Sequence, residues 1–499
     1  MNVIRLSVCG LFTLVLYLNR ASSADSNFIV ILTDDQDIVL NGMNPMENVR
    51  KLLANRGALF TNAFTSSPIC CPSRASILSG QYAHNHQTKN NSCNGGCYGS
   101  HWQEKIEPTA LPVHLQKNGY ETFYAGKYLN KYFSETIPPG WSQWYGLHGN
   151  SAYFNYTLNE NGVLKKYDND YLTDVLNTKT LEFLSNAKKP FFAMIAPPAP
   201  HTPCEAAERH SHSFENVKAL RTPNFNIPSG VLDKHWLLRM PPATLHNETI
   251  EWLDDIYRKR WQSLLAVDDM VANIVHTLEE KNLYDDTYII YTSDNGYHVG
   301  QFGQAIDKRQ PYETDIRVPF VISGPKIPPK IVFDYPVALI DIFPSVLTRA
   351  GIPLPDFVDG QSFFATNKND ETVLSTDYGN RQILIEYWGE GDSTTYSPEC
   401  NWHKGDRLSQ CSIEAECHCQ DAWNNTYSCI RQTFVQKKEH KIFCEFQDRE
   451  NFVEAYDLSV DPYEMTNIAF DMLPSEHALL SLALEKLSKC KGDSCRQIY

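Results

Sequence analysis

The chain has 499 residues, of which 42% are hydrophobic, 12% aromatic and 21% charged, and its formal net charge is −15. This composition excludes a disordered or fibrous chain, and the acidic balance argues against a nucleic-acid binder, which normally carries a basic excess. The length favours two or more domains, although one large α/β domain with an appendage also fits. A few local cations can still hold a small anionic substrate in such an acidic chain.

The N-terminus is typical of a secretory signal peptide. Arg5 precedes an apolar run, Leu6–Leu18, and small residues follow at Ala21–Ala24. We predict that residues 1–23 are cleaved and that the mature chain is lysosomal or secreted. A buried first strand or a membrane anchor is the alternative, but the run is short for a bilayer. No later segment is long and apolar enough to be a transmembrane helix, so no membrane span is expected.

Short apolar runs along the chain predict buried strands, with helices between them. The runs are residues 28–32, 191–196, 287–291 and 318–322. Apolar side chains recur on one helical face over residues 264–278. Strands that alternate with helices indicate an α/β fold: a large, mixed, mostly parallel sheet flanked by helices.

The character of the sequence changes near residue 380. We predict a catalytic domain over residues 24–380 and a smaller, disulfide-rich α+β domain over residues 381–499, which ends in a helix around residues 478–487. No internal repeat and no long low-complexity linker interrupts the chain. The sequence therefore predicts two domains joined without a flexible tether.

Cysteine usage fits an oxidising compartment. There are 14 cysteines; if Cys9 leaves with the signal peptide and Cys70 is modified, 12 remain, enough for six disulfides unless Cys71 stays free. A zinc site built on Cys417, His418 and Cys419 is the alternative for the crowded C-terminal stretch, but in a secreted chain we favour disulfides. The crowded cysteines are Cys400, Cys411, Cys417, Cys419, Cys429 and Cys444.

Four sequons agree with passage through the secretory pathway. They begin at Asn90, Asn155, Asn247 and Asn424. Each is a common chance match, but together with a signal peptide they predict N-glycosylation at surface positions.

Polar residues follow two of the predicted strands. Asp34 and Asp35 end the first, and Asp294 and Asn295 end the third. Parallel strands place their carboxyl ends at one edge of a sheet, where α/β proteins build their sites. Adjacent carboxylates repel each other and favour a cation, and oxygen ligands suit calcium or magnesium. Either pair alone is more often a cap or a turn; both at buried strand ends predict a metal site.

The run Cys70–Arg74 (Cys-Cys-Pro-Ser-Arg), continued by Ala75–Gly80, resembles the signature of the sulfatase family. A disulfide cysteine beside a turn proline is the alternative reading. The resemblance implies an alkaline-phosphatase-like sulfatase fold, a calcium ion, and oxidation of Cys70 to formylglycine (3-oxoalanine) by the formylglycine-generating enzyme. It also makes Cys70 a ligand of the metal, together with the four oxygen donors at the strand ends.

The family's chemistry explains why such a residue is useful. One hydroxyl of the hydrated aldehyde attacks sulfur, the ester oxygen leaves, and the second hydroxyl then loses its proton so that collapse to the aldehyde expels sulfate. The resemblance gives Arg74 a role in stabilising the diol. It makes Lys127 and Lys308 sulfate contacts, with Lys308 able to protonate the leaving oxygen, and His201 a contact that assists this oxygen.

The match to the family departs from its usual pattern at one position. Many sulfatases carry a His two residues after the Gly-Lys element, where this chain has Leu129, so Tyr128 or Asn130 is expected to contribute instead. His298 is predicted to contact the substrate, with support of its own turn as the alternative. Arg309 and Arg317 are expected to serve packing and ion pairs.

A narrower resemblance is to the sulfatases that remove the 6-sulfate of N-acetylglucosamine in heparan and keratan sulfate. It is carried by Cys70–Arg74, by Ser293–His298 leading to Ile306–Gln310, and by Cys419–Cys429. Extracellular endosulfatases look similar but carry a long basic insertion that this chain lacks, so cleavage at a chain end is preferred. The resemblance thus implies a sulfated glycosaminoglycan as substrate and degradation of that polymer as the role, with an endosulfatase or arylsulfatase as the alternative.

Two other classes of function remain open. The related alkaline-phosphatase fold supports phosphoryl transfer, usually with a Ser or Thr nucleophile and paired transition metals, whereas Cys70 and the mixed Asp and Asn ligands favour sulfate. A non-catalytic protein that binds sulfated glycans would keep the pocket and lose the nucleophile. The presence of Cys70 and the surrounding cations favours the enzyme.

Overall fold

The structure is a computed structural model that describes residues 26–188, 190–228, 233–242, 244–365, 373–375 and 379–499. The predicted signal peptide lies outside these residues. Within them, no helix is both long and apolar enough to cross a membrane.

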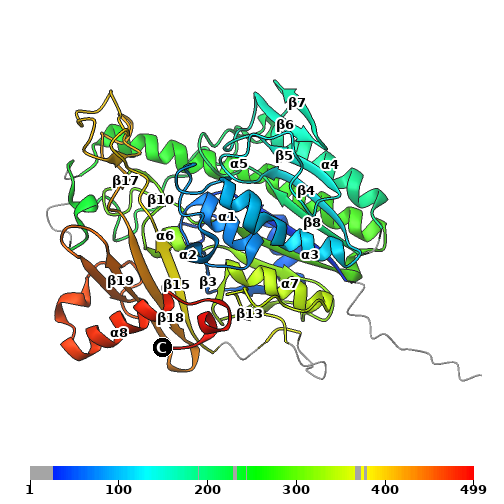
Figure 1. Ribbon diagram of the computed structural model, residues 1–499. Helices are drawn as coiled ribbons and strands as arrows, with labels where there is room; N and C mark the ends of the chain where they lie inside the picture. The colour runs from blue at the N-terminus through cyan, green and yellow to red at the C-terminus, as the bar shows by residue number, and fades with distance from the viewer. Residues whose placement is uncertain (1–25, 189, 229–232, 243, 366–372, 376–378) are drawn as a thin grey trace, which may run out of the picture.

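A ten-stranded sheet forms the centre of the molecule (Figure 1). In spatial order its strands are β13 (Ile331–Phe333), β2 (Ala58–Phe60), β12 (Phe320–Ser323), β9 (Thr287–Ser293), β1 (Asn27–Thr33), β8 (Phe191–Ala196), β4 (Glu121–Lys127), β5 (Gln143–Leu147), β6 (Tyr156–Glu160) and β7 (Val163–Tyr167). The run β9-β1-β8-β4-β5 is parallel throughout. β12 is antiparallel to both of its neighbours, and β6 is antiparallel to β5 and β7. The predicted mixed, mostly parallel sheet is confirmed.

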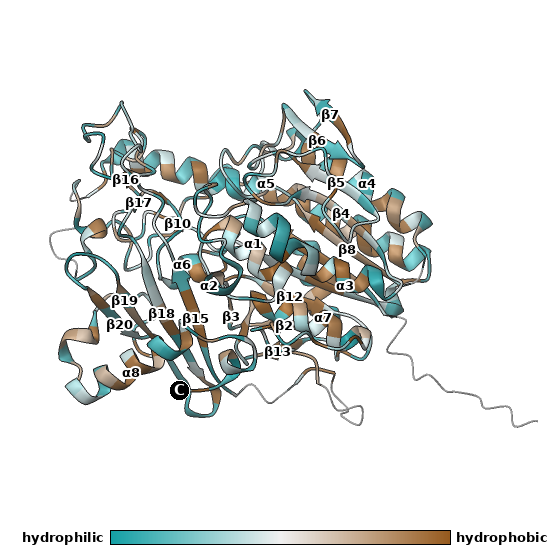
Figure 2. Ribbon diagram, viewed as in Figure 1, coloured by the Kyte–Doolittle hydropathy of each residue, from teal (hydrophilic) through white to brown (hydrophobic). Residues whose placement is uncertain are grey.

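Helices cover both faces of this sheet. α1 (Cys70–Ser79), α3 (Leu111–Lys117) and α7 (Ile342–Ala350) pack on one face, and α4 (Leu172–Asn186) and α5 (Asn247–Glu280) on the other (Figure 1). Successive side chains of a strand point to opposite faces. Phe28, Val30 and Leu32 of β1 accordingly join the first hydrophobic cluster, and Ile29 and Ile31 join the second. Figure 2 shows the central strands as mostly hydrophobic, as a sheet buried on both sides requires.

A second, antiparallel sheet lies beside the first (Figure 1). Its strands, in order, are β15 (Asn380–Tyr387), β18 (Tyr427–Phe434), β19 (Glu439–Phe446) and β20 (Val453–Asp457). α8 (Pro474–Leu487) packs against it, and contains the helix predicted near the C-terminus. We keep a domain boundary near residue 380 as our proposal, because the second sheet begins there.

Short elements complete the described chain. Three two-stranded sheets pair β3 (Ala63–Phe64) with β14 (Val337–Ala338), β10 (His298–Val299) with β11 (Ile306–Asp307), and β16 (Leu408–Ser409) with β17 (Asp421–Ala422). Two short helices are α2 (Ala83–His86) and α6 (Glu313–Ile316). The β10–β11 pair matters for the site, since it carries Lys308 at its end.

Disulfides, rather than zinc, hold the cysteine-rich stretch. The pairs are Cys71–Cys97, Cys400–Cys417, Cys411–Cys419, Cys429–Cys444 and Cys490–Cys495. The zinc alternative is wrong, because both of its cysteines are oxidised and His418 bonds the backbone oxygen of Leu237. Cys71 is not free. Within the described residues five disulfides form instead of six, since Cys93 and Cys204, like Cys70, are not disulfide-bonded.

Two of the four sequons lie on the surface. Asn155 and Asn247 are exposed, which agrees with the prediction of glycosylation there. The expectation of surface positions is wrong for Asn90 and Asn424, whose side chains are 8% and 6% exposed. Oδ1 of Asn90 also accepts hydrogen bonds from the backbone and hydroxyl of Ser92, which hold this side chain against the loop.

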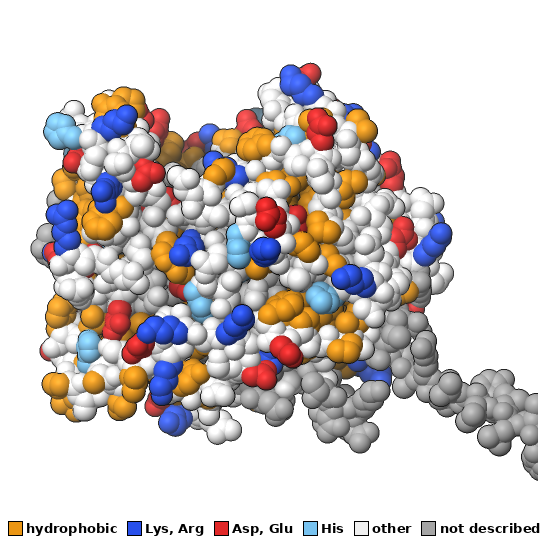
Figure 3. All heavy atoms as spheres, viewed as in Figure 1, with side chains coloured by type: hydrophobic (Ala, Val, Ile, Leu, Met, Phe, Trp, Pro, Cys, Tyr) orange, Lys and Arg blue, Asp and Glu red, His pale blue; other side chains and the backbone are white. Residues whose placement is uncertain are grey.

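The molecular surface shows no basic stripe on the face drawn in Figure 3, where Lys and Arg are interspersed with Asp and Glu. A mixed surface of this kind agrees with the acidic net charge of −15.

Candidate active site

The carboxyl ends of β1 and β9 bring the predicted oxygen ligands together. Asp34 and Asp35 follow β1, and Asp294 follows β9, its parallel neighbour. One carboxylate oxygen from each of the three lies within 4.8 Å of the others, and all three side chains are fully buried. Three carboxylates this close, out of contact with water, require positive charge between or beside them.

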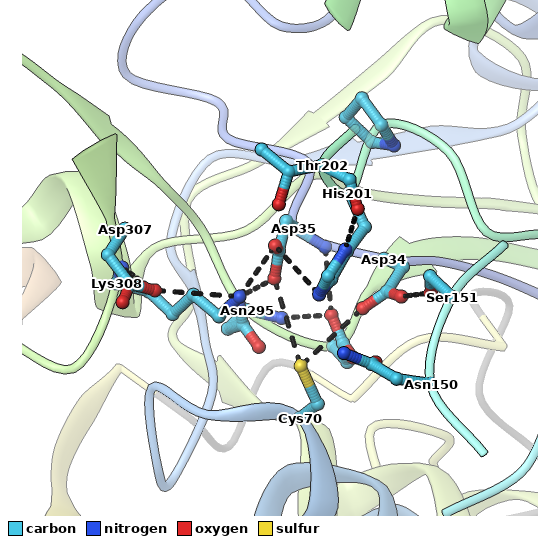
Figure 4. A network of polar contacts seen from close by, with 12 residues as sticks. Asp34, Asp35, Cys70, Asn150, Ser151, His201, Thr202, Asn295, Asp307 and Lys308 are labelled. Carbon is cyan, nitrogen blue, oxygen red and sulfur yellow. Dashed lines mark hydrogen bonds and ion pairs between the residues drawn. The ribbon is translucent and has the colours of Figure 1, made fainter. Parts of the chain in front are cut away.

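Cys70 is the first residue of α1 and points into this cluster (Figure 4). Its Sγ lies 3.6 Å from Oδ1 of Asp34 and 3.9 Å from Oδ1 of Asp35. The helix N-terminus adds a partial positive charge at this point, which favours an anion in front of residue 70. The disulfide of Cys71 with Cys97 and a hydrogen bond from the Cys71 backbone N–H to Oδ1 of Asn91, 2.8 Å long, fix the start of the helix.

The unmodified thiol of Cys70 is a weak nucleophile in this environment. Burial raises the pKa of Cys70 to about 12, even though Lys127 and Lys308 oppose the shift. A thiol attacks as its thiolate, and near neutral pH almost none is present at such a pKa. The geometry thus presents residue 70 to the cluster, but its thiol is not suited to attack.

Buried cations pair with the carboxylates one by one. Lys127 Nζ lies 2.7 Å from Asp34 Oδ2, and Lys308 Nζ lies 2.7 Å from Asp35 Oδ2. Arg74 Nε lies 2.8 Å from Oδ2 of Asp294. Burial alone would raise the pKa of Asp34, but the nearby cationic groups, Lys127 first, together outweigh it and hold the pKa well below its usual range. These pairs hold both lysines at the cluster.

The donor set fits a divalent cation. Oδ1 of Asn295 is buried and has no hydrogen-bond partner, while its Nδ2 donates to Oδ1 of Asp35 at 2.7 Å. Burial raises the pKa of Asp294 to about 7 in spite of Arg74, and a bound cation would favour the ionised carboxylate. An orphaned amide oxygen beside carboxylate oxygens is a set of hard donors, which magnesium and calcium prefer.

His201 approaches the same cluster from the loop after β8. Its Nε2 lies 3.8 Å from Oδ2 of Asp35, and its Nδ1 lies 2.5 Å from the backbone oxygen of Thr202 (Figure 4). Burial lowers the pKa of His201, although Asp34 and Asp35 act in the opposite direction. With Nδ1–H donating to that carbonyl, Nε2 is free to take a proton or to hydrogen-bond a ligand.

A cleft of about 570 Å³ opens above these groups. His201 and Lys308 line it. One wall comes from the main sheet's loops, and another wall, which is uncharged, comes from the cysteine-rich stretch: Gln410, Cys411, Ser412, Ala415 and Gln420. A larger groove of about 900 Å³ along α4 contains none of the predicted site residues, so the cleft is the candidate site.

Leu129 stands at the position where many sulfatases have a His, and the structure shows where this residue and its two neighbours lie. Leu129 is fully buried in the hydrophobic core, and the Tyr128 hydroxyl donates to Glu107 at 2.8 Å inside that core. Asn130, by contrast, lines the cleft. Of the two substitutes that the sequence suggested, only Asn130 is positioned to meet a ligand.

His298 does not line the cleft itself, but it contacts a residue that does. Its Nδ1 lies 3.0 Å from Oδ1 of Asp315, and its Nε2 lies 3.2 Å from Oε1 of Gln420. Gln420 lines the cleft, whereas His298 is not among the lining residues. The prediction of a direct substrate contact stays untested; both ring nitrogens already have protein partners, so His298 can act through Gln420.

Several residues at the site were not predicted. Ser151 donates a hydrogen bond from its hydroxyl to Oδ2 of Asp34. Arg309 forms the expected ion pairs, with Asp307 at 3.0 Å and with Glu390, but these three also line the cleft. The adjacent charges of Asp307, Lys308 and Arg309 were a usable signal for this, whereas nothing local marks Ser151 or Glu390.

Comparisons with known proteins agree with this site. The sequence matches the model of the Sulfatase family over residues 26–352. It is also 44% identical to human N-acetylglucosamine-6-sulfatase over 490 residues, which covers 95% of this chain and 87% of the relative. The chain belongs to the sulfatase family. It is a sulfuric ester hydrolase, and the predicted membership of the sulfatase family is confirmed.

Other relatives of this sulfatase extend the picture. The goat N-acetylglucosamine-6-sulfatase is 43% identical, covering 94% of this chain and 84% of the relative, and a putative extracellular sulfatase Sulf-1 homolog of Caenorhabditis elegans is 35% identical, covering 93% and 70%. The solved structure of BT4656 in complex with its substrate D-glucosamine-2-N,6-O-disulfate has a TM-score of 0.71 at 23% identity, covering 93% of this chain and 98% of that one. This last likeness confirms the sulfatase fold. The family generally uses a divalent metal, in agreement with the donor set described above.

Proposed function

We propose that this sulfatase hydrolyses the 6-sulfate ester of N-acetylglucosamine residues in heparan sulfate and keratan sulfate during glycosaminoglycan degradation. The observation that carries the proposal is the identity of 43–44% with three mammalian N-acetylglucosamine-6-sulfatases, over 93–95% of this chain. That match extends beyond the family segment 26–352 into the C-terminal part, which supplies one wall of the cleft. Relatives named extracellular sulfatase and arylsulfatase are less similar, at 31–41%.

Residue 70 supplies the nucleophile in this proposal. Oxidation by the formylglycine-generating enzyme during maturation converts Cys70 to formylglycine, whose hydrated form carries the hydroxyl that attacks sulfur. Support comes from the buried thiol, whose pKa near 12 makes it a poor nucleophile, and from the signature around it. Arg74 holds Asp294 and lies with its Nη2 3.5 Å from Oδ1 of Asp34, so its charge stabilises an anion at residue 70.

The two lysines and His201 bind the sulfate group in this proposal. Two of them also deliver a proton to the leaving oxygen. Lys127 and Lys308 lie at the cluster around residue 70, each paired to one carboxylate at 2.7 Å, and together they neutralise the charge of the ester. Lys308 and His201 both line the cleft, where the sugar must leave. We assign to them the delivery of a proton to the departing oxygen, a contribution of about 10²- to 10⁴-fold.

Calcium is the proposed metal. Asp34, Asp35, Asp294 and Asn295 would hold it, with residue 70 as the remaining protein ligand. When bound, the ion lowers the pKa of the diol and binds sulfate oxygens. The buried, unpartnered Oδ1 of Asn295 supports a cation at this position. Dialysis against a chelator should abolish turnover, and calcium should restore it more effectively than magnesium.

The proposed location is the lysosome, with secretion as the alternative. The N-terminal sequence favours entry into the secretory pathway, where cysteine oxidation and disulfide formation both take place. The five disulfides of the described chain agree with that route.

A substrate panel tests the proposed function. The purified protein is assayed with 6-sulfated N-acetylglucosamine, 2-sulfated uronate and N-sulfated glucosamine, each at the end of an oligosaccharide. Release of sulfate from the first substrate is expected. Turnover confined to the other two would refute the substrate, and turnover of internal 6-sulfates at equal rates would favour an endosulfatase.

A further inference from the structure

Asn130 lines the cleft and carries an unused hydrogen-bond acceptor. It lies three residues after the end of β4, is only 7% exposed, and lines the cleft. Its Nδ2 donates to Oδ1 of Asn150 at 3.1 Å, which fixes the orientation of the amide. Its Oδ1 is buried and has no hydrogen-bond partner within the described residues. Buried polar atoms without partners are uncommon and require an explanation.

Asn150 presents the complementary donor. Its Oδ1 is occupied by Asn130, and no partner among the described residues takes its Nδ2. Asn150 also lines the cleft and precedes Ser151, whose hydroxyl donates to Asp34. Figure 4 shows the Asn150 side chain extending towards the middle of the site. An acceptor and a donor therefore lie close together at the cleft, on two side chains that one hydrogen bond joins.

A hydroxyl group is the partner that satisfies both atoms at once, because it donates one hydrogen and accepts another. Its hydrogen would go to Oδ1 of Asn130 and its oxygen would accept from Nδ2 of Asn150. An ether oxygen, a glycosidic oxygen or a sulfate oxygen can only accept, and would leave the buried Asn130 oxygen unpaired. Such an unpaired group costs more than the bond itself is worth.

We propose that Asn130 and Asn150 recognise one free ring hydroxyl of the sulfated sugar and thereby set the specificity of this sulfatase. The inference rests on the proposed function and deepens it. On a 6-sulfated N-acetylglucosamine the ring hydroxyls are those at carbons 3 and 4. In a chain linked through carbon 4, a free 4-hydroxyl exists only on the terminal residue, so recognition of that hydroxyl selects the end of the chain.

The experiment compares 6-sulfated N-acetylglucosamine with its 3-deoxy and 4-deoxy analogues. For the wild-type enzyme, kcat/KM is expected to fall about ten- to a hundredfold for one of the two analogues, because the site is built to bond that hydroxyl. In the Asn130→Ala variant, the ratio of kcat/KM for the parent sugar to kcat/KM for that analogue should fall close to one. Asn186→Ala is the matched control, since Asn186 is exposed and its amide bonds only the backbone of its own helix; its ratio should equal the wild-type ratio.

Asn150→Ala provides a second variant at an exposed position and is expected to reduce the same ratio, which keeps the test valid if Asn130→Ala fails to fold. Identical ratios in wild type and both variants would overturn the inference. Failure of the proposed function looks different, because the wild-type enzyme would then hydrolyse neither the parent sugar nor its analogues. An effect confined to the 3-deoxy analogue would support recognition of a hydroxyl and exclude selection of the chain end by this pair.

Discussion

Nζ of Lys308 lies 2.7 Å from Oδ2 of Asp35, and this contact joins the end of β11 to the end of β1 across the site. Its counterpart is the contact of Lys127 with Asp34, also 2.7 Å long. Burial alone would lower the pKa of Lys308, but the nearby acidic groups, Asp35 first, together outweigh it and raise the pKa above its usual range. In the proposed reaction Lys308 is therefore a cation that can give up a proton to a stronger base.

Lys308→Ala is expected to lower kcat for the sugar 6-sulfate about 10²- to 10⁴-fold, the usual contribution of a general acid. The loss should be smaller for an aryl sulfate, whose phenolate leaves without a proton. Steady-state kinetics on both substrates measure the difference. Lys117→Ala removes a similar charge from the exposed surface of α3 and serves as the control. Equal losses on the two substrates would mean that Lys308 binds sulfate but does not protonate the leaving oxygen.

His298 is expected to control substrate binding through Gln420. Burial alone would lower the pKa of His298, but Asp315 outweighs it and raises the pKa above 6.5. With Asp315 on one nitrogen and Oε1 of Gln420 on the other, the doubly protonated ring satisfies both contacts. The contribution of the charged His298 ring to substrate binding is fully present below the ordinary pKa near 6.5 and is lost as the pH rises through the raised value.

His298→Phe should therefore raise KM severalfold at acidic pH with a smaller change in kcat, and should remove the increase in KM that the wild-type enzyme shows towards alkaline pH. Initial rates from acidic to alkaline pH test this. The control is His276→Phe, since His276 is exposed on α5. A collapse of kcat with unchanged KM would instead place His298 in the chemical step.

Glu107 makes the fold more stable in acid. Burial raises the pKa of Glu107 to about 7, against hydrogen bonds from Tyr128 and Trp102 that lower it, while the ordinary value is 4.5. The unfolded chain releases this proton more easily, so deprotonation favours unfolding. The cost begins above pH 4.5, is complete above about pH 7, and amounts to about 3 kcal/mol.

Glu107→Gln should raise the free energy of unfolding relative to wild type at pH 7.5 by more than at pH 5. Urea unfolding at the two pH values measures the difference, with Glu104→Gln, at an exposed position of the same turn, as the control. A stability difference that is the same at both pH values would show that Glu107 does not titrate in this range.

The disulfide Cys411–Cys419 is expected to shape the uncharged wall of the cleft. It closes a loop of 8 residues, so replacing both cysteines by serine should cost about 2–3 kcal/mol of stability. Because this loop contributes several lining residues, KM for the sugar sulfate should rise as well. Replacing both Cys490 and Cys495 should lower stability without changing KM. Equal KM values in the two double variants would show that this loop does not contribute to substrate binding.

Much of the fold and the centre of the site could be predicted from the sequence. Buried parallel strands have continuous apolar runs, and the polar residues that end them, such as Asp34 and Asp294, must meet at one edge of the sheet. The signature at Cys70 then indicated the sulfatase family. Local pattern was sufficient here, because each of these residues is placed by a regular element.

The contacts made by loops could not be predicted in the same way. His298 meets Gln420 across 122 residues of sequence, and the Asn130–Asn150 pair joins two loops without any periodic pattern. The sequon at Asn90 was misjudged for the same reason, since its burial depends on how the loop closed by Cys71–Cys97 folds back. Positions of this kind are set by tertiary packing.

Mass spectrometry of the reduced tryptic peptide 57–74 from active enzyme tests the central claim most directly, because this peptide contains residue 70. We expect formylglycine at position 70, and a Cys70→Ala variant that is folded but inactive. An unmodified thiol at position 70 in fully active enzyme would contradict it.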